Sequence, residues 1–383
     1  IYLYIDERLK LNFMKLNFER EKLLNALSVV SKAIPGRTTN DILECALFNI
    51  TDEGIIISAN NNELGIETKI DGISHGFGKA AIDLKLMLDI VRKLDFPDGR
   101  INIKIDDENF ITTISSGKSV FKIQARNGEE FNYLPDININ NSVSISQFAL
   151  KEVIKQTVFA ANVNDTNKMT GGELIELDEN MLKFVALDGY RVSIRHIMLN
   201  EGFKNDKCVI PAKNLIEIGR IIEGDSEKKI TIYFSDNHVM FKYDTTSVIS
   251  RIMTGDYFDL KYMLSSDYET KVRLSRLSLL NSIDRALVFI RENNNKPLIF
   301  EISDETLKLR MESIYGSMND EIECDKSGNN IMIAFNPKYF IDALKAVDDE
   351  FVDIYMTNSR SPCFIRDANG MYIYLILPVN FVA

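Results

Sequence analysis

The amino-acid sequence predicts an α+β fold made of three repeated domains, each built of helices and antiparallel sheets. Two observations predict it: one amphipathic helical pattern occurs three times at nearly constant spacing, and similar strand patterns follow each copy. Helices that are segregated from runs of antiparallel strands are typical of α+β proteins. A length of 383 residues also fits two or three domains better than one.

The three helical segments share a lysine that is followed four residues later by an acid. The lysines are spaced by 128 and 125 residues, apolar residues recur at i, i+3 and i+4, and helix-starting residues such as Asp83 or Pro211 precede them. Chance agreement of ordinary helix and strand patterns is the alternative, but it does not account for three aligned pairs. The segments and their pairs are 81–91 (Lys85, Asp89), 209–219 (Lys213, Glu217) and 334–344 (Lys338, Asp342).

The segments around these helices repeat as well. Each helix is followed by an alternating, β-branched strand pattern and then by a hairpin pattern, and each repeat opens with another helical stretch. The order in each repeat is therefore helix, strands, helix, strands. The predicted strands are 101–105, 230–234 and 352–356, the hairpins 110–125, 239–253 and 363–377, and the opening helices 19–33, 148–161 and 274–291.

Two short segments predict the domain boundaries. Residues 134–141 are rich in Pro and Asn, and residues 265–267 separate the second hairpin from the third repeat. We therefore expect domains at 14–138, 139–265 and 266–383, each of a size that suits one core. Residues 1–13 are expected to be an N-terminal extension, because the Lys-Leu-Asn-Phe of Lys10–Phe13 is repeated at Lys15–Phe18.

The composition argues against several classes of protein. A chain that is 45% hydrophobic and 26% charged is typical of globular proteins, and neither a membrane-spanning run nor a secretory signal is present. Four scattered cysteines fit reduced thiols in the cytoplasm, and three histidines without ligand-like spacing give no basis for a metal site. The net charge of −11 argues against a simple basic DNA-coating protein, but not against positive charge concentrated on one face.

Two motifs are similar to parts of enzyme sites. Gly76–Ala81 matches the glycine pattern of nucleotide-binding turns, which need a parallel strand–helix–strand unit and a suitably placed acid. The surrounding α+β repeat argues against that function. Asp188 could act as a catalytic acid, but no second carboxylate or histidine is positioned beside it, so a role in a turn is expected.

Four segments carry a resemblance to one family. Met14–Leu24 is like that family's first strand and helix, and Glu63–Lys69 is like a strand of its first domain. Ala186–Val192 reads Ala-Leu-Asp-Gly-Tyr-Arg-Val, close to the family's Ala-Thr-Asp-Gly-His-Arg-Leu, and Tyr374–Val379 matches its ending. Together with the threefold repeat, these segments resemble the β subunit of bacterial DNA polymerase III, the replication sliding clamp, from Met14 to Phe381.

The resemblance implies the DNA clamp fold, in which two protomers join head to tail, first domain to third, as a closed ring. It implies a cytoplasmic homodimer that encircles duplex DNA without sequence preference. Such a processivity factor tethers the DNA polymerase III alpha subunit, the clamp loader and other proteins with a clamp-binding motif. No enzymatic activity, cofactor, metal or membrane is implied. A clamp-like monomeric adaptor and a DNA-modifying enzyme with clustered, metal-holding carboxylates are the alternatives.

A first set of residues is expected to contact DNA. The repeated helices each carry a net charge of +1 although the whole chain is acidic, and Lys and Arg attract phosphates without regard to sequence. An ordinary solvated helix face would have a similar composition. With the resemblance added, the expected DNA contacts are Arg37, Lys85, Asn164, Lys168, Lys213, Arg220 and Lys338.

A second set is expected to form a pocket for a short extended peptide, roughly Gln-Leu-x-Leu-Phe, which partners of the family carry. Such a pocket needs apolar walls and a few polar groups. Arg191 is expected to cover an apolar wall with its stem and to offer donors at the rim. The chain departs from the family at Thr170, Phe258 and Asn380, so its peptide preference is expected to differ. The expected pocket residues are Thr170, Leu187, Gly189, Tyr190, Arg191, Val192, Phe258, Tyr262, Met263, Asn336, Tyr339, Arg360, Pro362, Leu375, Ile376, Leu377, Pro378 and Val379.

Overall fold

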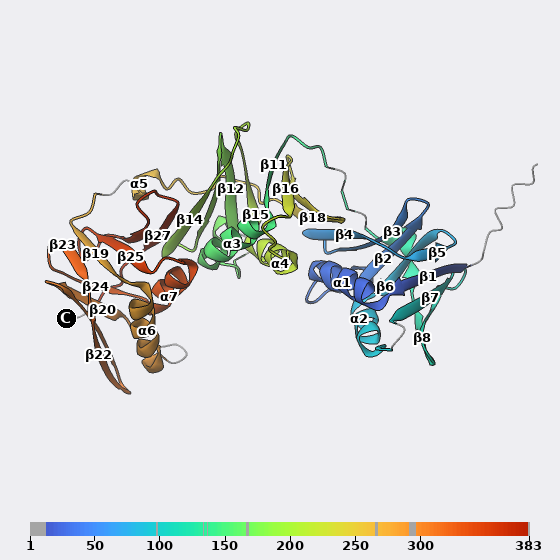
Figure 1. Ribbon diagram of the computed structural model, residues 1–383, viewed down its shortest axis with the longest axis horizontal. Coiled ribbons are helices and arrows are strands. Elements are labelled where there is room, and N and C mark those ends of the chain that lie inside the picture. The colour runs from blue at the N-terminus through green and yellow to red at the C-terminus, as the bar shows by residue number, and fades with distance from the viewer. Residues whose placement is uncertain are drawn as a thin grey trace, which may run out of the picture. The chain divides into compact units, whose positions relative to one another are not determined.

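The structure is a computed structural model that describes residues 13–96, 99–132, 134–135, 137–165, 168–264, 267–290 and 296–381. The expected N-terminal extension lies outside the described residues except for Phe13. The chain forms two compact units (Figure 1), one of the residues up to 145 together with 228–251, the other of 146–227 together with the residues from 252 onward. No helix of the described chain is long and apolar enough to cross a membrane.

The described part of the first unit contains two antiparallel sheets and two α-helices. Its elements are β1 (Phe13–Glu19), α1 (Arg20–Val30), β2 (Cys45–Thr51), β3 (Gly54–Asn60), β4 (Leu64–Ile70), β5 (Ile73–His75), β6 (Gly78–Asp83), α2 (Leu84–Lys93), β7 (Arg100–Asp106), β8 (Ile111–Ser116), β9 (Ser119–Gln124), β10 (Arg126–Asn127), β11 (Asn141–Ser146), β16 (Lys229–Phe234), β17 (His238–Tyr243) and β18 (Thr246–Arg251). One sheet has the order β5-β1-β7-β8-β9, and the other has the order β10-β6-β2-β3-β4-β18-β17-β16-β11. Helix α1 packs on β3 and β4 and against α2.

The second unit also contains two sheets. Its elements are α3 (Gln147–Thr157), β12 (Gly172–Asp178), β13 (Met181–Leu187), β14 (Arg191–Met198), β15 (Asp206–Pro211), α4 (Ala212–Ile221), α5 (Lys261–Leu264), β19 (Thr270–Ser275), α6 (Arg276–Ala286), β20 (Leu298–Ser303), β21 (Thr306–Ser313), β22 (Gly316–Glu323), β23 (Asp325–Gly328), β24 (Ile331–Phe335), α7 (Pro337–Ala346), β25 (Phe351–Met356), β26 (Cys363–Arg366) and β27 (Tyr372–Ile376). The sheet orders are β15-β12-β13-β14-β27-β26-β25-β19-β23 and β22-β21-β20-β24. Helix α3 packs against α4 and α7, and α6 packs against α7.

The strand registers confirm the threefold repeat. One register occurs three times, with residue numbers shifted by 127 and then by 125, in the opposed pairs Leu47–Ser58, Leu174–Val185 and Ile299–Arg310. The strand that follows, β4, β14 or β22, continues each copy at the same shift. A slip of one residue would turn every side chain to the other face of the sheet, so this agreement reflects one shared fold.

The predicted helices are all present. Helices α1, α3 and α6 open the repeats, and α2, α4 and α7 are the repeated amphipathic helices. Asp83 caps α2 by accepting from the N–H of Leu86 (2.8 Å), and Asn336 caps α7 by accepting from the N–H of Lys338 (3.1 Å). The predicted order began each repeat with its helix and omitted the strand directly before it, β1, β11 or β19, although the resemblance implied the first of these.

The glycine motif at Gly76–Ala81 lies in antiparallel structure. It runs from the end of β5 into β6, and β6 pairs antiparallel with both β2 and β10. The parallel strand–helix–strand unit of a nucleotide-binding turn is therefore not what this segment forms. Gly76 instead allows its segment to pack closely against β1, since a Cβ on Gly76 would lie 2.7 Å from the carbonyl oxygen of Phe13.

Candidate binding sites

One aspartate fixes the turn between β13 and β14. Its Oδ1 accepts hydrogen bonds from the backbone N–H groups of Tyr190 (2.9 Å) and Arg191 (3.1 Å), and Gly189 has a φ of +90°, which favours glycine. Asp188 therefore has the turn role that the sequence predicts. The turn leaves Tyr190 exposed and begins β14 at Arg191.

An apolar floor lies beside this turn. Leu187, Val192 and Leu375 belong to one buried cluster, and Leu377 packs against it. Val192 lies directly opposite Leu375 in the β14–β27 pair, so the second and third repeats both contribute to the floor. Leu260, in the connector before the third repeat, packs against the same cluster. The floor thus combines segments that are far apart in the sequence.

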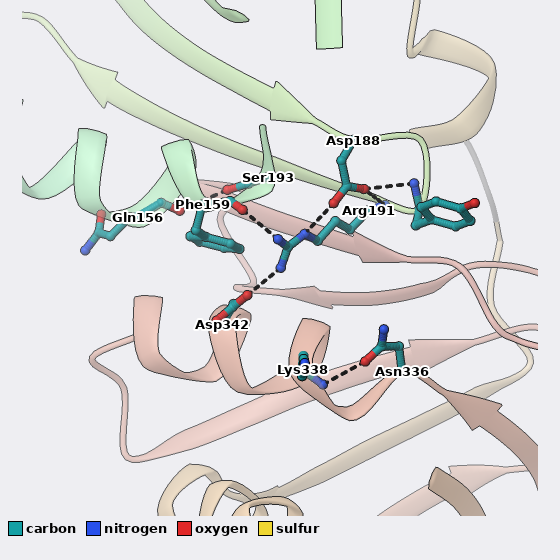
Figure 2. Close-up of polar contacts among 9 residues, drawn as sticks. Gln156, Phe159, Asp188, Arg191, Ser193, Asn336, Lys338 and Asp342 are labelled. Atoms are coloured by element: carbon teal, nitrogen blue, oxygen red, sulfur yellow. Dashed lines mark hydrogen bonds and ion pairs between the residues drawn. The ribbon is translucent and has the colours of Figure 1, made fainter. Parts of the chain in front are cut away.

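Arg191 joins the second repeat to the third (Figure 2). Its Nε donates to Asp188 (3.0 Å), its Nη1 to Asp342 on α7 (2.6 Å) and its Nη2 to the carbonyl of Phe159 (2.6 Å). The guanidinium also lies over the rings of Phe159 and Tyr339, at 5.3 and 4.6 Å from their centroids. The expectation that Arg191 offers donors at the rim stays a prediction, because two acids and a carbonyl engage three of its five N–H groups.

Exposed aromatic side chains lie on the segments that contribute to the floor. Tyr190 stacks on Tyr339 with ring centroids 6.3 Å apart and an interplanar angle of 22°. Tyr262 is 89% exposed, and Phe258 and Met263 are also exposed. A buried apolar floor with exposed aromatic groups beside it suits a peptide that carries apolar anchor side chains.

One expected pocket residue does not contribute its side chain to the floor. Ile376 follows Leu375 on β27 and packs in the core of the third repeat, because successive side chains of a strand point to opposite faces. Thr170 lies in a short 3-10 turn, Met169–Gly171, whose contribution to the floor is Met169.

The other expected residues lie on segments that adjoin the floor or the α7 cap. Asn336 is occupied in capping α7, and Arg360 and Pro362 lie in the turn between β25 and β26. The backbone N–H of Arg360 donates to the side chain of Asn358 (2.9 Å). The segment Leu377–Val379 is tied at both ends, by Leu377 N–H to the carbonyl of Tyr190 and by Val379 N–H to that of Ala334.

Sequence reasoning missed several side chains that build or support the floor. Tyr257, Leu260 and Leu264 come from the connector and recur at i, i+3 and i+7, a helical spacing that was visible in the sequence. The hydroxyl of Tyr257 donates to the carbonyl of Val185 (3.0 Å) and so anchors the connector on β13. Phe159 gave no such signal, because its contacts with Arg191 and Tyr374 join segments that are distant in the sequence.

A buried carboxyl lies near this anchor. Glu173 on β12 is fully buried, with its Oε1 2.5 Å from the hydroxyl of Thr157, and that hydroxyl lies 2.6 Å from the carbonyl of Val153. A hydroxyl has one proton and a carbonyl can only accept, so Thr157 donates to Val153 and the carboxyl of Glu173 donates to Thr157. Burial raises the pKa of Glu173 to about 8, which agrees with a protonated carboxyl at neutral pH.

All seven expected DNA-contact side chains are exposed. Lys85, Lys213 and Lys338 occupy the same position in the first turn of α2, α4 and α7. Lys168 forms an exposed ion pair with Asp165 (3.2 Å). Exposed cations of this kind remain free to exchange a protein partner for a phosphate, because surface ion pairs contribute little stability.

The acids of the repeated helices are engaged separately. Asp89 pairs with Arg92, Glu217 with Arg220 and Asp342 with Arg191. In the part of the chain that the structure describes, no group of three or more His, Cys, Asp or Glu side chains is arranged to hold a metal ion. Each acid thus has its own partner. A metal-dependent enzyme, the alternative, would instead need these acids to converge on one site.

Two sheets end in strands with exposed apolar side chains. Strand β9 is the last strand of the five-stranded sheet, and β22 is the last strand of the four-stranded sheet. Val120 and Phe121 on β9 are 60% and 38% exposed, and Ile314 and Tyr315 before β22 are 83% and 52% exposed. Strands that end a sheet carry unpaired backbone groups and pair readily with another chain.

The chain matches one protein family along most of its length. Residues 14–135 match the N-terminal domain of the DNA polymerase III beta subunit, residues 144–259 its central domain and residues 261–380 its C-terminal domain. The chain is 29% identical over 378 residues to the beta sliding clamp of Staphylococcus aureus, covering 96% of this chain and 99% of that protein. It is 28% identical over the same length to the beta sliding clamp of Staphylococcus epidermidis.

Solved structures agree with this match. A DNA polymerase III beta subunit from Eubacterium rectale is 48% identical, with a TM-score of 0.92, covering 96% of this chain and 99% of that chain. The DNA polymerase sliding clamp from Bacillus subtilis is 26% identical, with a TM-score of 0.91, covering 96% of this chain and 100% of that chain.

Proposed function

Since the chain belongs to the family of DNA polymerase III beta subunits, we propose that it works as a sliding clamp, a processivity factor that encircles duplex DNA. It tethers the replicative polymerase and other DNA-metabolism proteins through the pocket around Leu187 and Leu375. It is a non-enzymatic accessory subunit with domains at 14–138, 139–265 and 266–383. It acts in the cytoplasm, an assignment that its four free, buried cysteines support.

The observation that carries this proposal is the way strands join consecutive repeats. Strand β4 of the first repeat pairs with β18 of the second, and β14 of the second repeat pairs with β27 of the third. If the same pairing continues, β22 of the third repeat pairs with a strand of a following repeat. Likewise, β9 of the first repeat pairs with a strand of a preceding repeat. A second copy of the chain supplies both, so two copies close head to tail into a ring.

The two internal junctions fix the register of the proposed contact between copies. At corresponding places the opposed pairs are Ile66–Val248 and Ser193–Tyr374. The equivalent residue on β22 is Met318, and the equivalent residue on β9 is Phe121. Met318 of one copy therefore opposes Phe121 of the other.

This register also brings opposite charges together. Lys118 opposes Glu321, and the backbone N–H of Glu321 donates to the carbonyl of Lys118. The corresponding bonds within the chain join Lys69 to Thr245 and His196 to Met371, at 3.0 and 2.9 Å. Cross-strand pairs of opposite charge stabilise a sheet.

The repeated helices are the proposed contact with DNA, and the pocket is the proposed contact with partner proteins. The exposed lysines at the starts of α2, α4 and α7 are suited to weak phosphate contacts, which permit sliding. The partners are duplex DNA, the DNA polymerase III alpha subunit, the clamp loader and other proteins with a clamp-binding motif. DNA is retained because it cannot leave the ring, so low affinity is compatible with function.

A disulfide across the proposed contact tests the ring. The variant with Phe121→Cys and Met318→Cys is mixed with nicked circular plasmid in reducing buffer and then oxidised. We expect a disulfide-linked dimer that stays on the circle in 1 M salt and is released when the plasmid is cut once. The four native cysteines are buried and should not interfere.

The matched control moves one cysteine by two residues on the same face. Phe121→Cys with Gly316→Cys should crosslink much more slowly, since Gly316 lies opposite Ile123 in the proposed register. A linked dimer that washes off circular DNA, or no difference between the two variants, would overturn the proposal.

The pocket has a separate test. A fluorescent Gln-Leu-x-Leu-Phe peptide should bind the intact chain saturably, and Leu377→Asp should abolish binding because a charge would enter the apolar floor. Phe77→Asp changes an exposed apolar residue that lies outside the pocket and should leave binding intact. Equal binding by both variants would exclude this pocket as the partner site.

A further inference from the structure

The first unit contains a polar pocket at its own junction of repeats. It has a volume of about 490 Å³ and lies where β4 meets β18, under the connector that follows β10. Its lining combines residues of the first repeat, the connector and the second repeat. The side chains that carry its chemistry are Asn62, Glu63, Asn132, Asn237, His238 and Arg251.

This pocket occupies the place that corresponds to the proposed partner pocket. The β4–β18 register and the β14–β27 register are equivalent, and a shift of 127 residues carries β3 and β4 onto β13 and β14. The lining residues Asn60, Asn62 and Gly65 thereby correspond to Leu187, Gly189 and Val192, and Ile249 and Arg251 correspond to Leu375 and Leu377. The fold thus provides the same recess twice, once at each junction.

The chemistry of the two recesses differs. Where the second junction has Leu187 and Leu377, the first has an amide and a guanidinium. The connector fills the apolar part of the first recess. Leu134 packs so closely on Gly65 that a Cβ added to Gly65 would lie 1.8 Å from Cδ2 of Leu134. Polar side chains line what remains open, together with Pro135 and Ile249.

Several polar groups of this recess are uncommitted. Among the described residues, no hydrogen bond or ion pair engages the side chains of Asn132, Asn237 or Arg251. Burial lowers the pKa of His238, and the nearby charge of Arg251 lowers it further. The neutral imidazole is therefore able to accept a hydrogen bond. Side-chain amides both donate and accept, as the peptide groups of an extended segment require.

We propose that the first junction is a second docking site, which takes an extended hydrophilic peptide segment of a partner protein with a carboxylate side chain directed at Arg251. The amides of Asn132 and Asn237 bind the peptide backbone, and Arg251 binds the carboxylate. The comparison with the second junction rests on the proposed function, but the recess and its uncommitted groups do not. A clamp with this site holds one partner by two chemically different contacts, which raises its apparent affinity.

Matched tripeptides test this site on the full chain. The probes are acetyl-Gly-Asp-Gly-amide and acetyl-Gly-Asn-Gly-amide, titrated while the backbone amide signals of Asn60–Gly65 and Asn132 are followed by NMR. We expect saturable shifts with the aspartyl peptide and about tenfold weaker binding of the asparaginyl peptide. Arg251→Gln should remove the difference between the peptides, and Arg92→Gln, on α2 of the same unit, should preserve it.

Two outcomes would overturn the proposal. One is the absence of saturable shifts at these residues, and the other is equal affinity for both peptides in the unsubstituted chain. Addition of the Gln-Leu-x-Leu-Phe peptide to the same sample separates this failure from failure of the proposed function. Shifts at Leu187–Val192 without any at Asn60–Gly65 would reject the second site alone, and the converse would reject the partner pocket alone.

Discussion

Glu173 shows how a single buried carboxyl makes the stability of the fold depend on pH. The carboxyl is protonated in the folded chain, because it must donate to Thr157, and its pKa is raised to about 8. In the unfolded chain the same carboxyl ionises at its ordinary pKa, near 4.5. The folded state therefore holds a proton that the unfolded state has lost between these two values, and stability falls as pH rises from about 4.5 to 8.

We expect Glu173→Gln to remove this dependence. A glutamine amide can donate to Thr157 as the carboxyl does, and it has no proton to lose. The free energy of unfolding of the variant, measured by urea denaturation and circular dichroism, should exceed that of the parent by a margin that grows by roughly 1.4 kcal/mol per pH unit toward pH 8. A margin that is constant between pH 5 and pH 8 would mean that Glu173 is ionised in the folded chain.

Arg191 is the residue that fastens the second repeat to the third. It bonds to Asp188 on its own turn, to Asp342 on α7 and to the carbonyl of Phe159, and its side chain is only 12% exposed. Its fork geometry suits two acids and a carbonyl at once, which a lysine could not match. Its effect on the proposed peptide pocket is therefore indirect, since it positions Tyr339 and the Asp188 turn.

Arg191→Ala should lower the free energy of unfolding by about 3 kcal/mol, because it leaves two partly buried acids without their partner. Peptide binding should weaken as well. Lys155→Ala is the control within the second unit, since the side chain of Lys155 is 62% exposed in its ion pair with Glu152. That substitution should change stability by less than about 0.5 kcal/mol, and equal losses in the two variants would contradict the fastening role.

At the scale of elements, the three amphipathic helices α2, α4 and α7 are the parts that the sequence predicts most directly. Each buries apolar residues at helical spacing and exposes a lysine at its second position. Because the interior of each repeat constrains only the buried face, the exposed face is open to selection for charge. This is the physical basis for assigning these faces to DNA.

The variant with Lys85, Lys213 and Lys338 all changed to alanine should bind duplex DNA more weakly. The slope of log affinity against log salt should fall by about 0.9 for each phosphate that the variant no longer neutralises. The control removes the same charge from strands, with Lys104, Lys229 and Lys308 changed to alanine. If both variants lose affinity equally, net charge rather than the helix faces governs binding.

At the scale of the whole molecule, the repeats are joined by sheets that continue from one repeat into the next. This design makes a closed ring the natural assembly, because each junction satisfies the backbone groups of two strands that would otherwise end a sheet. Strands β9 and β22 each end a sheet. Lys118 directly precedes β9 and Glu321 lies on β22, at positions that the internal registers place opposite each other.

Charge reversal tests this register in solution. Lys118→Glu and Glu321→Lys should each weaken the dimer, and the two together should restore it. A head-to-tail ring has two contacts, so a loss of about 1 kcal/mol at each raises the dimer dissociation constant about thirtyfold. Sedimentation velocity over a range of concentrations measures this, and a double variant no tighter than either single one would reject the register.

The apolar floor and its surroundings were only partly predictable, for a reason that particular residues make clear. The Asp188 turn was predicted because its hydrogen bonds are local, within three residues. The partners of Arg191 were not, because Phe159 and Asp342 lie 32 and 151 residues away in the chain. Ile376 was misassigned because the sequence shows a run of apolar residues, whereas the alternation of the strand sends its side chain into another core.

By itself, the sequence determined the threefold repeat, the helices, the hairpins and the turn at Asp188. Each of these follows from periodicity or capping within a few residues, where local geometry decides the conformation. Only the tertiary structure decided which strands join neighbouring repeats, what Arg191 binds, and that the first junction is a polar recess while the second is apolar. These depend on contacts between distant segments. In the first recess, Leu134 fills the apolar part by packing on Gly65, which lies 69 residues away in the chain.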